Sequence, residues 1–371
     1  MDGITEAIAR NIKERRRALG LTQASLAEAI GYSVKAVSKW ESGRGAPPTV
    51  TLPALAKALK TDIDSLLSAE SAEVLYLGID GGGTKTEFAL ANGEGEILRT
   101  LHLASSNPSD IGIEAAITVL KDGIAEITAG IPKSRVSLFA GLAGGTTEGV
   151  KERLTAFFES FGFLSVKNGS DAENAVAAAL GRRDGIAVIM GTGSVTFAQS
   201  GGKLYRTGGY GYLLGDAGSG FAFGREAILA ALKAEDGSGK ETLLLDAVRR
   251  KCGKETVLAC LGDFYRGGKR TVAGYASCLF EAYEQGDAAA KDILEKNLLA
   301  VAETVRGAAR HIEGTPFPAV LCGGIADAYG DTVIPYLKKM LAGEAKKIEI
   351  TRCARPLIYG ALTLAGMPEK G

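Results

Sequence analysis

Cysteine, histidine and tryptophan are scarce in this chain of 371 residues. The five cysteines are scattered without a Cys-x-x-Cys pair, and His102 and His311 are the two histidines. This pattern argues against a zinc ribbon, a disulfide framework, and a metal or hydrolase site built from clustered histidines. Cysteines used in this way fit a reducing cytosol.

The chain also lacks a long apolar run and an excess of charge of either sign. No stretch of about 18 apolar residues is present, and the N-terminus opens with Asp2 and Glu6 instead of an apolar signal core. Basic residues number 43 and acidic residues also number 43. We therefore expect a cytoplasmic protein that does not engage membranes and that does not bind nucleic acid along its whole length.

The first 67 residues have the pattern of a small bundle of helices. Apolar residues recur at helical spacing from residue 4 to residue 19, and Gly20 ends that helix. Thr22 and Ser33 are expected N-caps of two short helices, and Gly31 supplies the turn between them. Two short helices joined by a glycine turn are the helix-turn-helix pattern.

The segment Leu21–Gly43 resembles the Cro/repressor-type helix-turn-helix family, through its Thr-Gln start and its Ser-Lys-Trp-Glu-Ser-Gly end. The resemblance implies that residues 1–67 bind double-stranded DNA with the second short helix in the major groove, and that a homodimer pairs half-sites. From Arg10 to Arg44 the sequence has eight basic and three acidic residues, a positive excess that agrees with DNA binding. The residues predicted to contact DNA are Gln23, Ser33, Lys35, Ala36, Ser38, Lys39 and Arg44.

Two further features of this region have a functional and a structural interpretation. The run Arg15–Arg17 is expected to meet phosphates, although three arginines also fit a solvated helix face. Trp40, the one tryptophan, is expected in the core. Residues 68–73 form a short polar linker, which permits mechanical coupling between the regions on either side.

The remaining three hundred residues contain two similar halves. The apolar run 74–80 leads into Gly81-Gly-Gly, and the apolar run 186–190 leads into Gly191-Thr-Gly-Ser. Further strand-like runs follow each loop, so the pattern predicts a duplicated unit. Three glycines can adopt backbone angles that side chains forbid and direct N–H groups into a hollow that suits phosphate, but they also fit an ordinary hairpin.

This constellation resembles the actin-like ATPase fold, and within it the BadF/BcrA-type ATPase and N-acetylglucosamine kinase family, from about Leu75 to the end. Asp80–Thr86 looks like the first phosphate motif, Gly191–Ser194 the second, and Leu321–Asp327 the adenosine motif. The resemblance implies an all-α helix-turn-helix domain followed by an α/β actin-like ATPase domain of two ribonuclease-H-like lobes. The expected lobes are 74–185 and 186–371, with helices near 332–341 and 356–365 closing the chain. The last helix is expected either in the second lobe or packed back on the first.

The same resemblance implies ATP and Mg²⁺ as cofactors. Asp80 is the expected magnesium ligand, through water, because it ends a buried strand. The hydroxyls of Thr84, Thr86 and Ser194 would assist, and Lys85 points either to phosphate or to solvent. The residues predicted to bind the cofactor are Asp80, Gly81, Gly82, Gly83, Thr84, Lys85, Gly191, Thr192, Gly193, Ser194, Gly323 and Gly324.

The acceptor implied by the resemblance is an amino sugar, N-acetylglucosamine or glucosamine. The residues predicted to contact it are Asn107, Gly145, Thr146, Asp171 and Asp216. Structural alternatives are that Asp171 caps the following helix and that Asp216 fixes its loop. The family's kinases carry an acid where Thr146 stands, and threonine cannot act as a general base, so Glu148 and Asp171 are the candidate catalytic residues.

Three functions follow from this reading. In the first, the chain is a transcription regulator whose kinase-like domain binds ATP and an amino sugar and retains some phosphorylation. In the second, it is an active amino-sugar kinase, a transferase, with an accessory DNA-binding arm. The third, an activator ATPase, ranks low because such proteins bridge an iron–sulfur cluster with cysteines near the lobe junction, whereas no cysteine here precedes Cys252.

Overall fold

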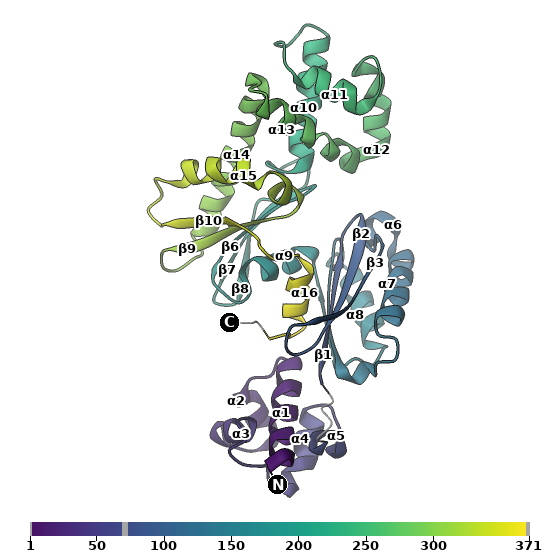
Figure 1. Cartoon of the computed structure of the whole chain (residues 1–371), viewed down its shortest axis with the longest axis vertical. Helices are drawn as coiled ribbons and strands as arrows, with labels where there is room; N and C mark the ends of the chain where they lie inside the picture. Colours follow the sequence, from purple (N-terminus) through teal and green to yellow (C-terminus); the bar gives the residue numbers. More distant parts are fainter. Residues whose placement is uncertain (1, 69–72, 369–371) are drawn as a thin grey trace. The chain divides into compact units, whose positions relative to one another are not determined.

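The computed structural model describes residues 2–68 and 73–368, so most of the expected linker lies outside the described residues. Contacts between residues divide the chain into two units, Met1–Gly181 with Pro356–Gly371, and Arg182–Arg355. An N-terminal helical region is followed by two five-stranded mixed sheets with their helices, which confirms the expected fold class (Figure 1). No helix in the described ranges is long and apolar enough to cross a membrane.

The N-terminal region is a bundle of five α-helices around one small core. Thr22 accepts from the Ser25 N–H and Ser33 accepts from the Ala36 N–H, so both expected N-caps are present. Gly31 has φ 71°, a left-handed conformation that favours glycine. The elements are α1 (Asp2–Ala18), α2 (Gln23–Ile30), α3 (Val34–Glu41), the 3₁₀ turn η1 (Thr49–Thr51), α4 (Leu52–Ala58) and α5 (Ile63–Leu67).

The first sheet follows in the order β3-β2-β1-β4-β5, with β1 antiparallel to β2 and parallel to β4. Its elements are β1 (Leu75–Gly81), β2 (Lys85–Ala91), β3 (Ile97–Ala104), α6 (Pro108–Ile111), α7 (Ile113–Ile127), η2 (Lys133–Arg135), β4 (Val136–Leu142), α8 (Val150–Glu159), β5 (Ser165–Gly169), α9 (Asp171–Leu180) and the C-terminal α16 (Ile358–Leu364).

Helices cover both faces of this sheet because β1 and β4 are apolar on both sides. Leu77 and Ile79 pack with α7 and α8 on one face, whereas Tyr76 and Phe139 pack with α16 on the other. Figure 1 shows α7 and α8 on one side of the sheet and α9 and α16 on the opposite side. A near-continuous apolar run is the pattern of a strand buried on both faces.

The second sheet has the order β10-β9-β6-β7-β8. Read from β8 to β10, this order repeats that of the first sheet from β3 to β5, so each strand of the first sheet has a counterpart in the second. The core of the second unit lies between the sheet and helices α10, α13, α14 and α15. The elements are β6 (Gly185–Met190), β7 (Ser194–Ser200), β8 (Lys203–Thr207), α10 (Gly220–Glu235), α11 (Leu244–Cys252), η3 (Leu258–Cys260), α12 (Leu261–Gly274), α13 (Ala276–Glu284), α14 (Ala288–Ala309), β9 (Phe317–Cys322), α15 (Gly324–Leu341) and β10 (Ile348–Arg352).

The last segment differs from the expectation in two respects. The helix expected near residues 332–341 is present, but α15 already begins at Gly324, directly after β9, and has a kink at Tyr329. The strand β10 was not expected, because five residues with Glu349 and Arg352 among them have little apolar character. Its place at the edge of the sheet explains that composition, since edge strands are commonly short and charged.

Candidate functional site

Asp80 ends β1 as a largely buried carboxylate that is held by Asn174 of α9. The Asn174 side-chain amide donates to Asp80 Oδ1 at 2.7 Å and to the carbonyls of Ile79 and Gly141. Burial raises the pKa of Asp80 to about 6, an effect that the Asn174 hydrogen bond opposes and the nearby Asp171 carboxylate reinforces. The Oδ1 atom of Asn174 is itself buried without a partner among the described residues.

Sequence analysis did not identify Asn174. It lies one helical turn after Asp171, so the two side chains share a face of α9. A Cβ atom at Gly141 would lie 2.3 Å from Asn174 Oδ1, so this side chain reaches Asp80 only because residue 141 is a glycine. An asparagine in an otherwise alanine-rich helix was the available signal.

The loop after β1 uses its glycines differently from the expectation. None of Gly81, Gly82 and Gly83 is among the glycines with positive φ. Gly81 is instead a close-approach position, because a Cβ there would lie 2.3 Å from Leu142 and 2.5 Å from the Ser106 hydroxyl. The Gly82 N–H donates to the Lys85 carbonyl at 3.0 Å and is therefore not free for a phosphate.

The side chains that follow the loop also divide into exposed and buried ones. Thr84 is exposed, and Lys85 is exposed with its ammonium 3.5 Å from Glu87. Thr86 is fully buried and donates to the Ala104 carbonyl at 2.8 Å, so its hydroxyl ties β2 to β3 and is not free for a ligand. The expected phosphate contact of Thr86 is therefore wrong.

The segments carrying Asn107 and Gly145 lie at the same edge of the first sheet. Ser105 Oγ donates to the Gly82 carbonyl at 3.0 Å, and the Ala143 N–H donates to the Gly81 carbonyl at 2.7 Å. A Cβ at Gly144 would lie 2.5 Å from Asn107 Oδ1, which places the amide against this turn. Asn107 also caps α6 by accepting from the Ser109 N–H at 3.0 Å.

Asp171 is the better-placed of the two candidate bases. Ser170 is the N-cap of α9, but the Asp171 side chain also binds a backbone N–H of the first turn, so the capping alternative for Asp171 is partly met. Burial raises the pKa of Asp171, and its Oδ1 accepts from the Ala172 N–H at 3.0 Å. Thr146 and Glu148 are both exposed.

In the second unit, the loop Gly191–Ser194 is the meeting point of two helix N-termini. The Gly220 and Phe221 N–H groups at the start of α10 donate to the carbonyls of Gly191 and Thr192. Gly323, with φ 95°, brings the start of α15 so close that a Cβ there would lie 2.8 Å from the Met190 carbonyl oxygen. The second phosphate motif and the adenosine motif therefore adjoin, beside the positive end of α15.

Asp216 lies directly beside this loop. It is 6% exposed, has φ 60°, and its Oδ2 is 3.2 Å from the ammonium of Lys269 on α12. Ser194 Oγ donates to the neighbouring Ala217 carbonyl at 2.7 Å. Because Asp216 forms an ion pair with Lys269, the alternative that it fixes its loop is partly met. Sequence analysis did not identify Lys269.

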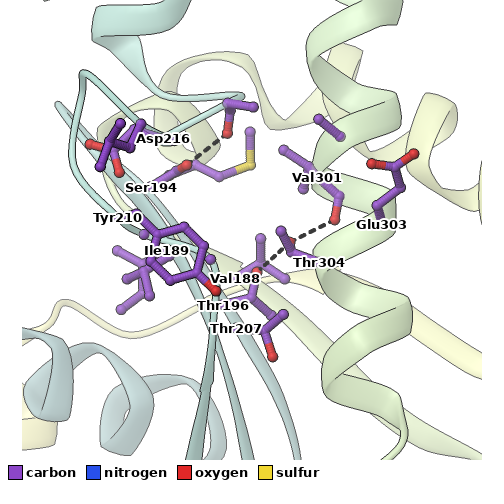
Figure 2. Close-up of a pocket in the computed structure, with 18 residues that line it drawn as sticks. Val188, Ile189, Ser194, Thr196, Thr207, Tyr210, Asp216, Val301, Glu303 and Thr304 are labelled. Carbon is purple, nitrogen blue, oxygen red and sulfur yellow. Dashed lines mark hydrogen bonds between the residues drawn. The ribbon is translucent and has the colours of Figure 1, made fainter.

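A cavity of about 350 Å³ adjoins Asp216 and Ser194 between the sheet and α14 (Figure 2). Figure 2 shows Thr196 and Thr304 joined by a hydrogen bond, of 2.8 Å, at the floor, with Tyr210 and Glu303 on opposite sides. Its volume and its mixture of apolar and polar walls are those of a small-molecule site. Gly323 and Gly324 are not among its lining residues.

The helix α3 has an exposed side and a buried side. Lys35 and Lys39 are exposed, whereas Ala36 and Ser38 are half-buried. The exposed Arg44 follows the helix, and its Nε donates to Ser42 Oγ at 3.1 Å. These residues form one face that could enter a groove, while Trp40 is 5% exposed, which confirms its expected core position.

Of the residues expected near DNA, Arg16 and Gln23 have partners inside the N-terminal region, and Arg15 is buried. Arg16 pairs with Glu41 at 2.5 Å and also donates to the Leu21 carbonyl. The Gln23 amide donates to Glu41 Oε2 at 2.9 Å, so its contact with DNA stays a prediction. Arg15 is 5% exposed, so the expected phosphate contact of this residue is wrong. Periodicity places Arg15 and Arg16 toward the core and leaves Arg17 exposed.

The described residues contain no group of three or more His, Cys, Asp or Glu side chains that could hold a metal ion. Mg²⁺ does not need such a group, because it commonly keeps several waters and binds one or two carboxylates plus phosphates. Asp80 fits this pattern, because burial and the nearby Asp171 carboxylate disfavour its ionised form. A bound cation would stabilise that form and lower the pKa of Asp80.

Comparison with known proteins gives two family matches. Residues 77–365 match the BadF/BadG/BcrA/BcrD ATPase family, and residues 12–66 match a helix-turn-helix family. An N-acetylmuramic acid/N-acetylglucosamine kinase from Clostridium acetobutylicum is 32% identical over 231 residues, which cover 59% of this chain and 74% of the relative. A helix-turn-helix transcriptional activator, BcrR, from Enterococcus faecalis is 42% identical over 59 residues, 16% of this chain and 29% of the relative.

Among solved structures, a candidate N-acetylglucosamine kinase from Chromobacterium violaceum superposes with a TM-score of 0.62 at 26% identity, over 79% of this chain and 99% of that protein. The match confirms the actin-like ATPase fold, and family membership implies use of ATP. The chain belongs to the BadF/BadG/BcrA/BcrD ATPase family and joins its kinase-like domain to an N-terminal helix-turn-helix domain.

Proposed function

We propose that this protein is a transcription regulator whose kinase-like domain binds ATP and an amino sugar and transmits that binding to its DNA-binding helices. One observation carries the proposal. The C-terminal end of α1 is packed into the core of the first unit: Ala18 is 1% exposed, and its carbonyl accepts from Ser165 Oγ at 2.9 Å. This attachment supports a regulator, because it gives a direct route from the first sheet to the helix-turn-helix region.

The proposed ligands are assigned to residues by chemistry. ATP supplies the transferable phosphoryl group and most of the negative charge that the site must neutralise, and Mg²⁺ would neutralise part of that charge. In the first unit, Asp80 would hold the hydrated cation and the loop at Gly83–Lys85 would hold phosphate, and the proposed sugar contacts there are Asn107, Gly145, Thr146 and Asp171. In the second unit, the loop at Gly191–Ser194 would hold phosphate with Gly323 and Gly324 against the nucleoside, and Asp216 is the proposed sugar contact.

The deciding experiment combines binding and turnover on the full chain. Purified protein is mixed with ATP, Mg²⁺ and each of N-acetylglucosamine, glucosamine and N-acetylmuramic acid, and both its thermal midpoint and ADP release are recorded. A sugar that shifts the midpoint and changes retention of genomic DNA fragments, without rapid ADP release, supports the regulator. A sugar that shifts the midpoint but leaves DNA retention unchanged contradicts it.

The second candidate is an active amino-sugar kinase that uses Asp171 as its base. Its support is the raised pKa of the buried Asp171, because a base is most effective when its pKa approaches the working pH. This candidate predicts sugar-dependent ADP release at about one per second or faster, as is typical of enzymes.

Thr146→Asp tests how much turnover depends on the missing acid. A well-placed general base contributes about 10²- to 10⁴-fold in rate, so the variant should raise ADP release by at least tenfold if the site is otherwise competent. Thr147→Asp, one residue further along the same exposed turn, is the matched control. If Asp171 already acts as the base, Thr146→Asp changes little and Asp171→Asn abolishes turnover.

A further inference from the structure

Lys269 is a cation at the second phosphate loop that no sequence motif identified. Its Nζ lies 3.0 Å from the position that a Cβ on Gly193 would occupy. The side chain is 35% exposed, so its ammonium is accessible as well as close. Gly193 is therefore a glycine that leaves room for a charged group at the tip of the loop.

The backbone is irregular on both sides of the Lys269–Asp216 contact. The helix α12 is interrupted at Gly268, whose φ of 60° and ψ of −154° are angles that only glycine adopts readily. Asp216, the partner of Lys269, also has positive φ and is one of two such non-glycine residues in the described chain, the other being Lys60. Strained backbone of this kind gathers at ligand sites, where surrounding contacts hold it.

Two contacts position the Lys269 ammonium and still leave N–H donors for a ligand. Asp216 Oδ2 is 3.2 Å away and almost fully buried, and the Tyr212 ring centroid is 5.8 Å from Nζ. An ammonium has three donors, so one ion pair leaves capacity for a phosphate oxygen. The alternative is a structural ion pair that only holds the loop in place.

We propose that Lys269 binds the polyphosphate of the nucleotide, with Asp216 as the carboxylate that aims it. This deepens the proposed function and rests on it, since it assumes that Gly191–Ser194 holds phosphate. Lys269 would act as a point charge on the β- or γ-phosphate, the role for which a flexible ammonium is suited. It would contribute to the affinity for ATP and ADP but not to that for adenosine.

The test measures ATP, ADP and adenosine binding by calorimetry with full-length protein. Lys269→Met should weaken ATP and ADP binding about 10- to 100-fold, the loss expected for a hydrogen bond to a charged group, and leave adenosine binding within twofold. Lys269→Arg should retain most of the affinity because it keeps the charge. Lys251→Met is the matched control, since Lys251 also lies over a tyrosine ring, at 5.6 Å, but hydrogen-bonds to Ser277.

The outcomes separate this inference from the proposed function. Wild-type protein that binds no ATP overturns both. Wild-type protein that binds ATP while Lys269→Met retains that affinity, or loses ATP and adenosine affinity equally, overturns only the role of Lys269. If Lys269→Met does not fold, Lys269→Gln replaces it: its ratio of ADP to adenosine affinity should fall about 10- to 100-fold below that of the wild type and of Lys269→Arg. Equal ratios in all three proteins overturn the role of Lys269.

Discussion

At the scale of single residues, Asp80 is the clearest case of a side chain whose setting costs stability. A carboxylate at the end of a buried strand is poorly solvated, and one amide donor, from Asn174, offsets only part of that loss. Asn174 Oδ1 is itself buried without a partner among the described residues, so this pair of side chains keeps an uncompensated polar atom.

Replacing Asp80 by asparagine should therefore flatten the pH dependence of stability. The folded pKa of about 6 lies above the ordinary value of 3.8, so the folded state binds the extra proton. The resulting stabilisation is fully present below the ordinary pKa and is lost as pH rises through about 6. Between pH 5 and pH 7.5 the wild type should lose about 1 to 1.5 kcal/mol relative to Asp80→Asn.

Thermal unfolding of both proteins without nucleotide, at the two pH values, provides the measurement. Asp122→Asn, an exposed substitution on α7 in the same unit, is the control and should follow the wild type. Equal pH dependence of stability in wild type and Asp80→Asn would contradict the raised pKa of Asp80 in the folded state.

At the scale of elements, the exposed helix α3 is held by a buried ionic network at its C-terminal end. Glu41 is 8% exposed and accepts from Arg16 of α1 and Gln23 of α2, so one carboxylate fixes three helices. The cost of burying these charges is offset only while all partners are present. The position of the residues predicted to contact DNA thus depends on the buried Glu41.

Glu41→Ala should lower the free energy of unfolding of the N-terminal region by about 3 kcal/mol, because it leaves the Arg16 guanidinium without its partner. Trp40 is the one tryptophan and lies in this core, so its fluorescence reports unfolding of this region within the full chain. Glu28→Ala, an exposed change on α2, should leave the transition within about 0.5 kcal/mol. An unchanged Trp40 transition in Glu41→Ala would contradict this account.

At the scale of the whole molecule, the chain passes twice between the units, at residues 181–182 and 355–356. The second passage leads into α16, which packs on the first sheet and ends beside α1. Ser137 Oγ donates to the Ala365 carbonyl at 2.5 Å and lies 2.6 Å from Ser165 Oγ, which contacts Ala18. A returning segment and the DNA-binding region therefore share one pair of serines.

The double variant Ser137→Ala and Ser165→Ala should uncouple sugar binding from DNA binding. Removing both hydroxyls leaves the Ala18 and Ala365 carbonyls without these donors, which loosens the attachment but leaves the Trp40 core intact. We expect a sugar-induced thermal shift like that of the wild type, with at least a threefold smaller sugar effect on DNA affinity.

Ser160→Ala, which removes a hydrogen bond to Phe157 on the exposed end of α8, is the control and should keep the full sugar effect. An unchanged sugar effect in the double variant would locate the coupling elsewhere in the protein.

The sequence by itself determined the elements and the motifs. Thr22 and Ser33 cap helices, the two apolar runs form central strands, and the glycine loops follow them, because caps, periodicity and turns depend on neighbouring residues. The repeated pattern also predicted a duplicated unit, which the matching orders of the two sheets confirm. The short edge strand β10 was missed, because its pairing with β9 is set by a partner distant in the chain.

Only the tertiary structure decided which side chains meet. Asn174 reaches Asp80 across 94 positions, Lys269 reaches Asp216 across 53, and Ser137 contacts Ala18 across 119. In the folded chain, two groups that the motifs suggested for phosphate binding are hydrogen-bonded within the protein: the Gly82 N–H and the Thr86 hydroxyl. Local pattern cannot show such contacts, because burial and hydrogen-bond partners are properties of the packed chain.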